Sequence, residues 1–589
     1  MIKLRERRVA CAPARMHLIV FALLLAFALL LGGATWRSVI QGDMLTSEAR
    51  SRYLDRIMIE GERGAIWDRN GRPMAMSAVV YSAHLNPVQF RGWAEKKPQA
   101  AARAAATLAA QLELDGAKID EILARTSGFA YLRHGLTPEE MRRARDAGIP
   151  YLRFEKRYRR FYPTAQEAAH VTGFINHEGR GMVGVERARH AELRPAAGQM
   201  RVLRTSGGQV LEVHSREPAT NGGDVYLTID SRLQYIAAVA LAQAVEHHQA
   251  RAGSAIVLDA VTGDILALTN VPSFNPNNIA AEPDLRRNRA LQDIFEPGST
   301  MKPVLAALAL EEGLLSPGTL LRTAKPLRYG SYLIQDKKID TDLTLTETIM
   351  RSSNVGAVRV AEMLDDAAMH AGYQAFGFGG GLLLGMAGET SGRLRPHESW
   401  RPVEKATMAY GYGLSANLLQ LARAYGVFAA DGMLAAPGLE LGAERPAPAR
   451  VLDPATARQV VAMLESVVST EGTARRAAVS GYRVAGKTGT THKRRTDGAK
   501  GYDRDLYQSL FVGLAPASRP RFVCAVLVDE PSRNGYYGGT VAAPVFAKVM
   551  AQALRLYGVP LDAPDAEEEE ASELIATSAP GAGPARKRG

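Results

Sequence analysis

The stretch that decides the fold is Glu296-Pro297-Gly298-Ser299-Thr300-Met301-Lys302-Pro303, near the middle of a chain of 589 residues. Its proline–glycine pair interrupts regular structure, and the apolar residues that follow, 304–312, favour a helix. Proline fits a helix only in its first turn, so Pro303 predicts that the helix begins at about Ser299. Ser299 and Lys302 then share one helix face, and the hydroxyl lies at the positive end of the helix dipole.

A serine beside a lysine can act as a nucleophile only when the lysine amine is neutral. Partial burial and a second nearby cation would both lower the pKa of Lys302 and favour that state. The pair is weak evidence alone, because an N-cap serine followed by a surface lysine explains the same residues.

Two further polar motifs follow along the chain. Ser352-Ser353-Asn354 comes after a capping box, Thr344 to Glu347, and a short helix ending near Arg351. Lys487-Thr488-Gly489-Thr490 lies on a predicted strand, where the glycine lets another backbone approach closely. Taken alone, the first motif would be explained as a polar turn between helices, and the second as an exposed edge strand. Together with serine-x-x-lysine, and in this order, they resemble the motif set of penicillin-binding proteins and serine β-lactamases.

The surrounding residues predict an α+β domain over 222–557. Asp230 caps a predicted helix, 231–247, and residues 254–270 are typical of a β-hairpin. A mostly helical middle follows, and then three strand-like runs and a last helix. We therefore expect one sheet assembled from both ends of the domain. The runs are Tyr482 to Ala485 leading into Lys487, Gln508 to Leu514 and Phe522 to Val528, and the helix is Val541 to Leu556.

A membrane segment is predicted at residues 16–36, an uncharged run of 21 residues flanked by Arg15 and Arg37. As a helix it would span about 31 Å, the hydrocarbon thickness of a bilayer. A cleaved signal peptide is the alternative, but the run is longer than signal peptides usually carry. The positive-inside rule predicts a cytoplasmic tail, 1–15, with the rest of the chain outside the cytoplasm.

Residues 45–220 mix short strands, turns and charged helices, and predict a separate domain, called here the pedestal domain. A strand and an Asn-Gly turn are expected at 64–71. No nucleophile-plus-base group stands out, so the pedestal domain alone resembles a binding or scaffold module. Helical composition and capping residues occur at 100–114, 117–124 and 137–147.

Composition excludes several other functions. The formal net charge of +11 is spread along the chain without a recognisable nucleic-acid module, so no nucleic-acid partner is predicted. No metal-ligand spacing occurs among the 12 histidines, and the glycines near 377–379 do not open a βαβ unit; no metal or other cofactor is predicted.

The membrane would separate the two cysteines, Cys11 and Cys524, so we expect no disulfide and a buried Cys524. Residues 562–589 have the composition of a disordered tail.

Most of the chain, to about residue 557, resembles the class B penicillin-binding proteins of the cell-division type. The resemblance implies an N-terminal membrane helix, an extended α+β pedestal domain, and a transpeptidase domain with an antiparallel sheet and helices on both sides. The sequence departs from the usual pattern at 379–381, where a threonine–glycine pair is more typical. The stretches that carry the resemblance are 63–69, Arg160-Phe161-Tyr162-Pro163, Gly184-Val185-Glu186, 227–230, 410–415 and Tyr537-Gly538-Gly539.

The resemblance implies a D,D-transpeptidase with Ser299 as its nucleophile. Ser299 would attack the carbonyl between two D-alanines of a stem peptide, and Lys302 would take its proton. Ser352 would relay a proton to the leaving amine. The backbone N–H groups of Ser299 and Thr490 would form the oxyanion hole. An amine of a neighbouring strand would then resolve the acyl-enzyme, and β-lactams would acylate the same serine.

Substrate binding is implied at the other motif positions. Asn354 would hold the substrate amide, and the strand of Lys487, Thr488, Gly489 and Thr490 would bind the terminal carboxylate.

The implied partners are D-Ala-D-Ala stem peptides, β-lactams, the membrane, a lipid II polymerase of the shape-elongation-division-sporulation family and other division proteins. A Gram-negative inner membrane and the division septum are the expected location, with the catalytic domain in the periplasm.

Other members of the wider group fit the sequence less well. A bifunctional class A protein would carry a glycosyltransferase domain, and a β-lactamase would lack the anchor and the pedestal domain. An elongation-type class B protein is the nearest alternative; the Ser352-Ser353-Asn354 form and the residues before Ser299 favour division. A β-lactam sensor or a catalytically silent division scaffold stays open as a different class. The segment 491–507 is expected to be a flap beside the cleft or a solvated hairpin loop.

Overall fold

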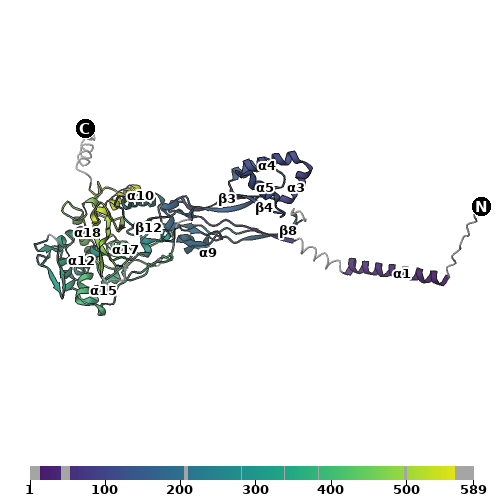
Figure 1. Ribbon diagram of the computed structural model, residues 1–589. Helices are drawn as coiled ribbons and strands as arrows, with labels where there is room; N and C mark the ends of the chain where they lie inside the picture. The colour runs from purple at the N-terminus through teal and green to yellow at the C-terminus, as the bar shows by residue number, and fades with distance from the viewer. Residues whose placement is uncertain are drawn as a thin grey trace, which may run out of the picture. The chain divides into compact units, whose positions relative to one another are not determined.

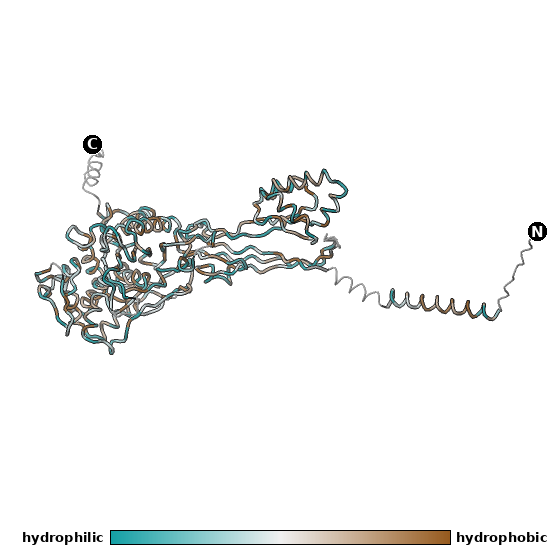
Figure 2. Tube along the Cα trace, viewed as in Figure 1, coloured by the Kyte–Doolittle hydropathy of each residue, from teal (hydrophilic) through white to brown (hydrophobic). Residues whose placement is uncertain are grey.

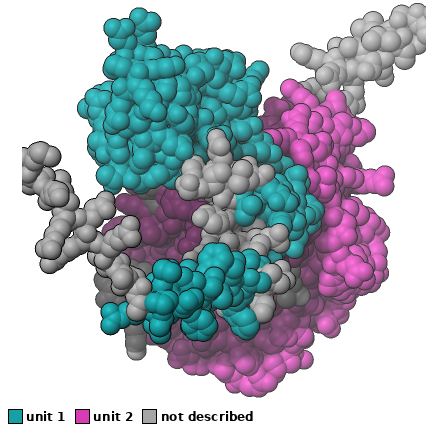
Figure 3. Space-filling model, turned by 90° about the vertical axis from the view of Figure 1, so that its right-hand side faces the viewer, with its two compact units in different colours: residues 1–62, 79–158, 195–221 teal, residues 63–78, 159–194, 222–589 magenta. Residues whose placement is uncertain are grey.

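The computed structural model describes residues 13–40, 54–204, 210–279, 282–336, 339–382, 384–495 and 501–563. The chain packs into two compact units, coloured separately in Figure 3. Unit 1 comprises residues 1–62, 79–158 and 195–221, and unit 2 comprises residues 63–78, 159–194 and 222–589. The pedestal range 45–220 therefore contributes segments to both units.

The predicted membrane segment forms one long helix, α1 (Pro13–Thr35), followed by a π-helical turn (Trp36–Ile40). None of its side chains is buried, and Figure 2 shows the helix as hydrophobic over its middle and hydrophilic near its two ends. Within the described residues, Pro13–Ser38 is the one stretch long and apolar enough to cross a membrane. Residues 1–12 of the predicted cytoplasmic tail, with Cys11, lie outside the described part.

Unit 1 contains a three-stranded antiparallel sheet and a helical cluster. Asp115 caps one predicted helix, and Thr137 and Glu140 form a reciprocal capping box on the next. Leu108, Leu112 and Ile122 belong to the buried core of this cluster. The three predicted helices are confirmed within two residues. The sheet is β1 (Leu54–Ile59), β8 (Gly198–Arg204) and β9 (Val210–Glu217), and the cluster contains α3 (Pro87–Lys96), α4 (Pro98–Leu112), α5 (Gly116–Ala124), α6 (Pro138–Asp146) and β4 (Ala130–Leu136).

The N-terminal segments of unit 2 are joined by a buried ion network. The Glu186 side chain is fully buried, and its two oxygens accept from Arg63 Nε and Arg160 Nε, each at 2.7 Å. A carboxylate between two guanidinium groups balances charges that would be costly to bury alone. The elements concerned are β2 (Ile66–Trp67), the start of β3 (Pro73–Leu85), the end of β5 (Leu152–Phe161), β10 (Val225–Tyr226), α7 (Ala169–Thr172), β6 (Phe174–Ile175), β7 (Gly181–Val183), α8 (Gly184–Ala188) and α9 (His190–Leu193).

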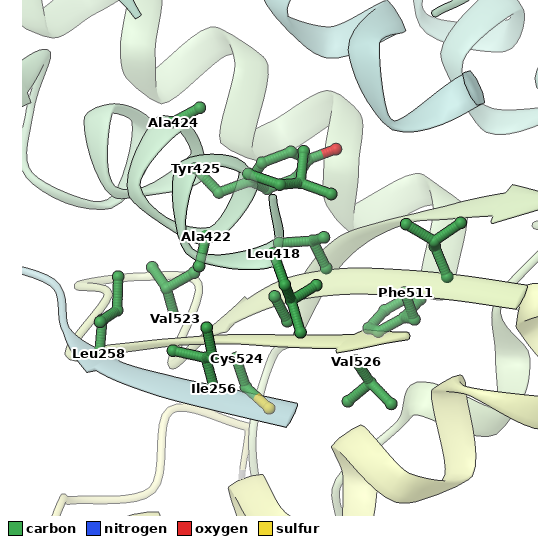
Figure 4. Packing of buried hydrophobic residues seen from close by; sticks show 14 of the residues in the cluster. Ile256, Leu258, Leu418, Ala422, Ala424, Tyr425, Phe511, Val523, Cys524 and Val526 are labelled. Atoms are coloured by element: carbon green, nitrogen blue, oxygen red, sulfur yellow. The ribbon is translucent and has the colours of Figure 1, made fainter. Parts of the chain in front are cut away.

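The centre of unit 2 is a five-stranded antiparallel sheet in the order β12-β11-β21-β20-β19. Helices α10 and α20 pack together on one face, and α17 and α18 on the other (Figure 1). Figure 4 shows α17 over Val523 and Leu258 of the sheet, and Cys524 is buried as predicted. The elements are β11 (Ala252–Asp259), β12 (Ile265–Val271), β19 (Ala485–Arg494), β20 (Tyr502–Ala515), β21 (Phe522–Asp529), α10 (Ser231–His247), α17 (Leu418–Ala429), α18 (Pro454–Val468) and α20 (Ala543–Leu556).

The hairpin, the Asp230-capped helix and the sheet built from both ends of the domain are confirmed. The predicted helix start at Ser299 is wrong. Residues Gly298–Met301 form a 3-10 turn, and α12 (Lys302–Glu311) begins at Lys302. Pro303, without an N–H, occupies the first α-helical turn as expected, while the residues before it close a tighter turn through Lys302 N and Ser299 O.

Most of the segment 491–507 is strand rather than loop. The strands β19 and β20 stay paired as far as Arg494 and Tyr502, and residues 496–500 lie outside the described part. The Lys493 amine lies 2.8 Å from the Asp529 carboxylate and 2.6 Å from the Glu530 carboxylate, which ties the extension to the end of β21.

The start of the predicted C-terminal tail is described as far as residue 563. The Asp562 carboxylate accepts from the backbone N–H of Arg483 at 2.7 Å, and residues 564–589 are outside the described part.

Candidate active site

The 3-10 turn that carries Ser299 is held by other parts of unit 2. The N–H of Gly298 donates to Gly411 O at 3.0 Å, and the Tyr425 hydroxyl donates to Thr300 O at 2.8 Å. Thr300 is fully buried and its own hydroxyl donates to Pro297 O. Ser299 is only partly buried, and its hydroxyl has no hydrogen-bond partner within the described residues. The turn therefore presents a free hydroxyl on a fixed backbone.

Lys302 lies one turn after Ser299 and is 1% exposed. Its Nζ lies 2.5 Å from Ser352 O, 3.1 Å from Ser352 Oγ and 2.8 Å from Asn354 Oδ1. Burial, and then the charge of Lys487, hold the pKa of Lys302 well below its ordinary value, against an opposing contribution from Asp336. A neutral amine donates to two acceptors and keeps a lone pair that accepts a proton from a hydroxyl.

The Ser352-Ser353-Asn354 motif forms the junction between α13 (Leu345–Met350) and α14 (Asn354–Met363). The capping box that precedes it is present, and Ser353 caps α14 by accepting from Gly356 N at 2.8 Å. Ser352 has a φ of 60°, a left-handed conformation that few residues other than glycine adopt. A strained serine at this junction directs both its carbonyl and its hydroxyl to the Lys302 amine.

Asp336 supports this junction and was missed by sequence reasoning. Its carboxylate accepts from Asn354 N at 2.6 Å and from Val355 N at 3.3 Å, and it accepts from the Ser353 hydroxyl in a shorter contact. These bonds satisfy the free N–H groups at the start of α14. Asp336 follows the short hairpin of β14 (Leu327–Tyr329) and β15 (Tyr332–Ile334), and no local pattern marks it.

The Lys487 to Thr490 strand lies along the edge of the sheet beside the Ser299 turn. A Cβ on Gly489 would lie 3.1 Å from Thr300 Cγ2 and 3.2 Å from Pro297 O, so the glycine permits this close approach. Burial lowers the pKa of Lys487 to about 7. Thr488 Oγ1 lies 2.9 Å from Thr473 Oγ1, and Thr490 Oγ1 accepts from Gly538 N at 3.0 Å.

The structure thus brings the predicted site residues into one region from three separate parts of the chain. Lys302, Ser352 and Asn354 are in direct contact. Gly489 packs against the turn that carries Ser299, and Lys487 is near enough to influence the pKa of Lys302. Thr473 and Gly538 brace the edge strand. Thr473 carried no signal in the sequence, and Gly538 was marked only as part of the Tyr537-Gly538-Gly539 resemblance.

Replacing Gly411 with alanine tests how the Ser299 turn is held. Gly411 has a φ of 84°, and an added Cβ would lie 2.0 Å from Gly298 O. We expect Gly411→Ala to lower the free energy of unfolding by about 2 kcal/mol or more and to slow acylation by a fluorescent penicillin. Thermal unfolding and acylation rate are the measurements.

The control is Gly426→Ala in α17, where an added Cβ meets nothing within 4 Å. A helical alanine there should leave acylation unchanged and cost no stability. If Gly411→Ala and Gly426→Ala have the same stability and the same acylation rate, the close approach of Gly411 to Gly298 does not hold the Ser299 turn.

Comparison with known families gives the site its context. A model described as the penicillin binding protein transpeptidase domain matches residues 253–551, which contain all three motifs. The chain belongs to the penicillin-binding proteins. A second model, the penicillin-binding protein dimerisation domain, matches residues 58–227.

Several curated relatives cover almost the whole of this penicillin-binding protein. The probable peptidoglycan D,D-transpeptidase PbpC of Pseudomonas aeruginosa is 37% identical, over 93% of this chain and 96% of its own length. The peptidoglycan D,D-transpeptidase FtsI of Escherichia coli is 35% identical, over 93% of both chains.

The similar solved structures include two of penicillin-binding protein 3. The transpeptidase domain of penicillin-binding protein 3 from Burkholderia pseudomallei shares 43% identity at a TM-score of 0.53, over 57% of this chain and 98% of its own. Penicillin-binding protein 3 from Mycobacterium tuberculosis, solved with aztreonam, shares 26% identity at a TM-score of 0.67, over 86% of this chain and 99% of its own.

Proposed function

We propose that this penicillin-binding protein is a peptidoglycan D,D-transpeptidase that crosslinks septal cell wall through an acyl-enzyme on Ser299. The observation that carries the proposal is the buried Lys302 amine, held against Ser352 and Asn354 one turn from a free serine hydroxyl. The full-length similarity to FtsI and to other D,D-transpeptidases supports it.

In the proposed acylation, Ser299 Oγ forms a bond with the carbonyl carbon of the penultimate D-alanine. The Ser299 proton passes to the neutral Lys302 amine. Collapse of the tetrahedral intermediate breaks the peptide bond, and a proton relayed through Ser352 leaves with the amine of the terminal D-alanine. The N–H groups of Ser299 and Thr490 would bind the developing oxyanion, each donor worth about 3 kcal/mol.

Deacylation repeats these steps in reverse with a different amine. The amine of a neighbouring stem peptide attacks the ester, loses a proton to the same Lys302–Ser352 pair, and releases Ser299. Asn354 would position the substrate amide. Lys487, Thr488 and Thr490 would bind the terminal carboxylate along the edge strand, where Gly489 keeps the strand close to the nucleophile.

The two site lysines are proposed to work in opposite charge states. Lys302 must be neutral to accept the serine proton, and Lys487 must be protonated to bind a carboxylate. Mutual repulsion between them favours one charge on the pair rather than two. Lys302 takes the neutral form, since burial and Lys487 both lower its pKa.

The second-order rate constant for acylation by a penicillin should fall as the pH rises through about 7. This follows because the pKa of Lys487 is about 7 and its deprotonated form loses the attraction for the β-lactam carboxylate. The decline approaches tenfold per pH unit above that value. Measuring the rate constant from pH 6 to 9 checks it.

Lys487→Arg is the matched variant, because arginine stays protonated throughout this range. Its profile should lack the alkaline decline. A wild-type rate constant that is flat or rises between pH 7 and 9 would contradict the assignment of Lys487.

The direct test of the function uses the full chain in lipid vesicles with polymerised, uncrosslinked glycan strands. We expect release of free D-alanine and the appearance of D,D-crosslinked muropeptides, both blocked by penicillin. Release of D-alanine without crosslinks would indicate a carboxypeptidase. If neither free D-alanine nor crosslinked muropeptides appear, the result would support the catalytically silent scaffold or the β-lactam sensor instead.

We further propose that the protein is a single-pass inner-membrane protein with a cytoplasmic N-terminus, a periplasmic catalytic domain and a septal location. The apolar helix α1 and the FtsI similarity support this. Its proposed partners are a lipid II polymerase of the shape-elongation-division-sporulation family and other division proteins, through α1 and the pedestal domain, 45–220. A pull-down in which an unrelated anchor replaces α1 and association is fully retained would count against a role for α1.

A further inference from the structure

A cavity lies in unit 2, outside the residues assigned to catalysis. It has a volume of about 410 Å³, within the range of small-molecule sites. Its walls come from the second half of α10, the start of α20, the 3-10 turn Arg475–Ala477 and the segment 534–541. Side chains of Ala240, Val541 and Val545 give it an apolar floor.

Basic side chains line this cavity. His247, Arg476 and Lys548 all line it and are all exposed, and none of its lining residues is acidic. Lys548 Nζ makes one contact, at 3.3 Å from Gln243 Oε1, and no ion pair joins Arg476 or Lys548 to a described carboxylate. His248 is buried beneath them, and the charges of His247 and Arg476 help to lower its pKa after the larger effect of burial.

The polar positions of the wall are fixed by the backbone. The Asn534 side-chain amide donates to His247 O at 2.8 Å, and His248 Nδ1 lies 3.0 Å from Arg533 O. These bonds join the end of α10 to the segment that follows β21. The cavity is therefore a preformed site rather than a gap between loosely held elements.

Two wall segments, the 3-10 turn Arg475–Ala477 and the segment 534–541 with its short helix Gly538–Val541, continue to the edge strand of the active site. In the segment 534–541, the N–H of Gly538 donates to Thr490 Oγ1 at 3.0 Å. Tyr536 O accepts from the hydroxyl of Ser509, on β20, at 2.5 Å. The chain that leads to Arg476 places Thr473 Oγ1 2.9 Å from Thr488 Oγ1. A ligand that moves either wall therefore moves a contact of Thr488 or Thr490.

We propose that this cavity binds a small organic oxyanion, a phosphate or carboxylate group on a compact apolar body, and that its occupation changes the rate of Ser299 acylation. Arg476 and Lys548 bind the oxyanion through charge-assisted hydrogen bonds, and the apolar floor takes the body of the ligand. The effect reaches the active site through the contacts of Thr473 and Gly538 with the edge strand.

The binding test titrates the full chain in detergent micelles by calorimetry with phenyl phosphate, benzoate and phenol. Phenyl phosphate or benzoate should saturate one site, the tighter of the two identifying the preferred oxyanion, and phenol should not bind. The double variant Arg476→Gln, Lys548→Gln should weaken binding at least about tenfold. Arg555→Gln, an exposed arginine of α20 away from the cavity, should not.

Ser299→Ala should bind like the wild type, which separates this proposal from the proposed catalytic role. Absence of saturable binding of either anion, equal binding of phenol, or unchanged binding in the double variant would overturn the site.

The coupling test measures acylation by a fluorescent penicillin with and without the anion that binds. We expect the rate to change at least about twofold, with the same concentration dependence as binding. The double variant, acylated at a near wild-type rate, should show no response. A response that persists in the double variant would indicate competition at Lys487 instead, and an unchanged wild-type rate would overturn the coupling.

Discussion

Lys302→Met should lower the rate of Ser299 acylation about 10³-fold while the protein stays folded. Methionine removes the amine that accepts the serine proton, and it leaves Ser352 and Asn354 without that partner. It fills a similar volume, and it also removes a lysine that is costly to bury, so stability should be maintained or increased. The rate of covalent adduct formation with a fluorescent penicillin, followed by intact mass, is the measurement.

The control is Lys405→Met in α16 (Pro402–Met408). The Lys405 amine is also largely buried, and it lies 2.5 Å from Leu364 O and 2.6 Å from the Asp366 carboxylate. It has no contact with the active-site residues. Its variant should be acylated at the wild-type rate. An acylation rate for Lys302→Met within about tenfold of the wild type would argue against Lys302 as the base.

Glu186→Ala should lower the free energy of unfolding by about 3–5 kcal/mol. The substitution leaves Arg63 and Arg160 buried without a counter-charge, since both guanidinium groups pair with the fully buried Glu186 carboxylate. A fall in the denaturant midpoint and the melting temperature of the full chain should report the loss. Surviving molecules should keep a normal acylation rate, because the network lies outside the site.

Arg458→Ala provides the comparison for this prediction. The Arg458–Asp431 pair lies in the same unit, and its side chains are 65% and 66% exposed. Breaking such a surface pair costs under about 1 kcal/mol. If Glu186→Ala lowers stability no more than Arg458→Ala, the buried network does not hold these segments together.

The sequence predicted the parts of the fold that depend on local chemistry. Asp230 caps α10 as expected, the hairpin before the site forms, and the capping box precedes Ser352. Each of these signals acts within a few residues, so a single sequence carries it. The three motifs also identified the site, because their combination and order are specific even though each is common alone.

Features that depend on distant contacts were not predictable in this way. Asp336 is one carboxylate in an irregular segment, and only the folded chain places it on the N-terminus of α14. The 3-10 turn at Ser299 depends on the approach of Gly411 and Tyr425. The extension of β19 and β20 beyond Thr491 depends on cross-strand pairing and on Lys493 reaching Asp529.

The measurement that tests the central claim most directly is intact mass after incubation of the full chain with a fluorescent penicillin, for the wild type and Ser299→Ala. The account predicts one covalent adduct per chain in the wild type, lost only slowly, and no adduct in Ser299→Ala. An adduct that survives in Ser299→Ala, or a wild-type chain that forms none, would contradict Ser299 as the nucleophile of this site.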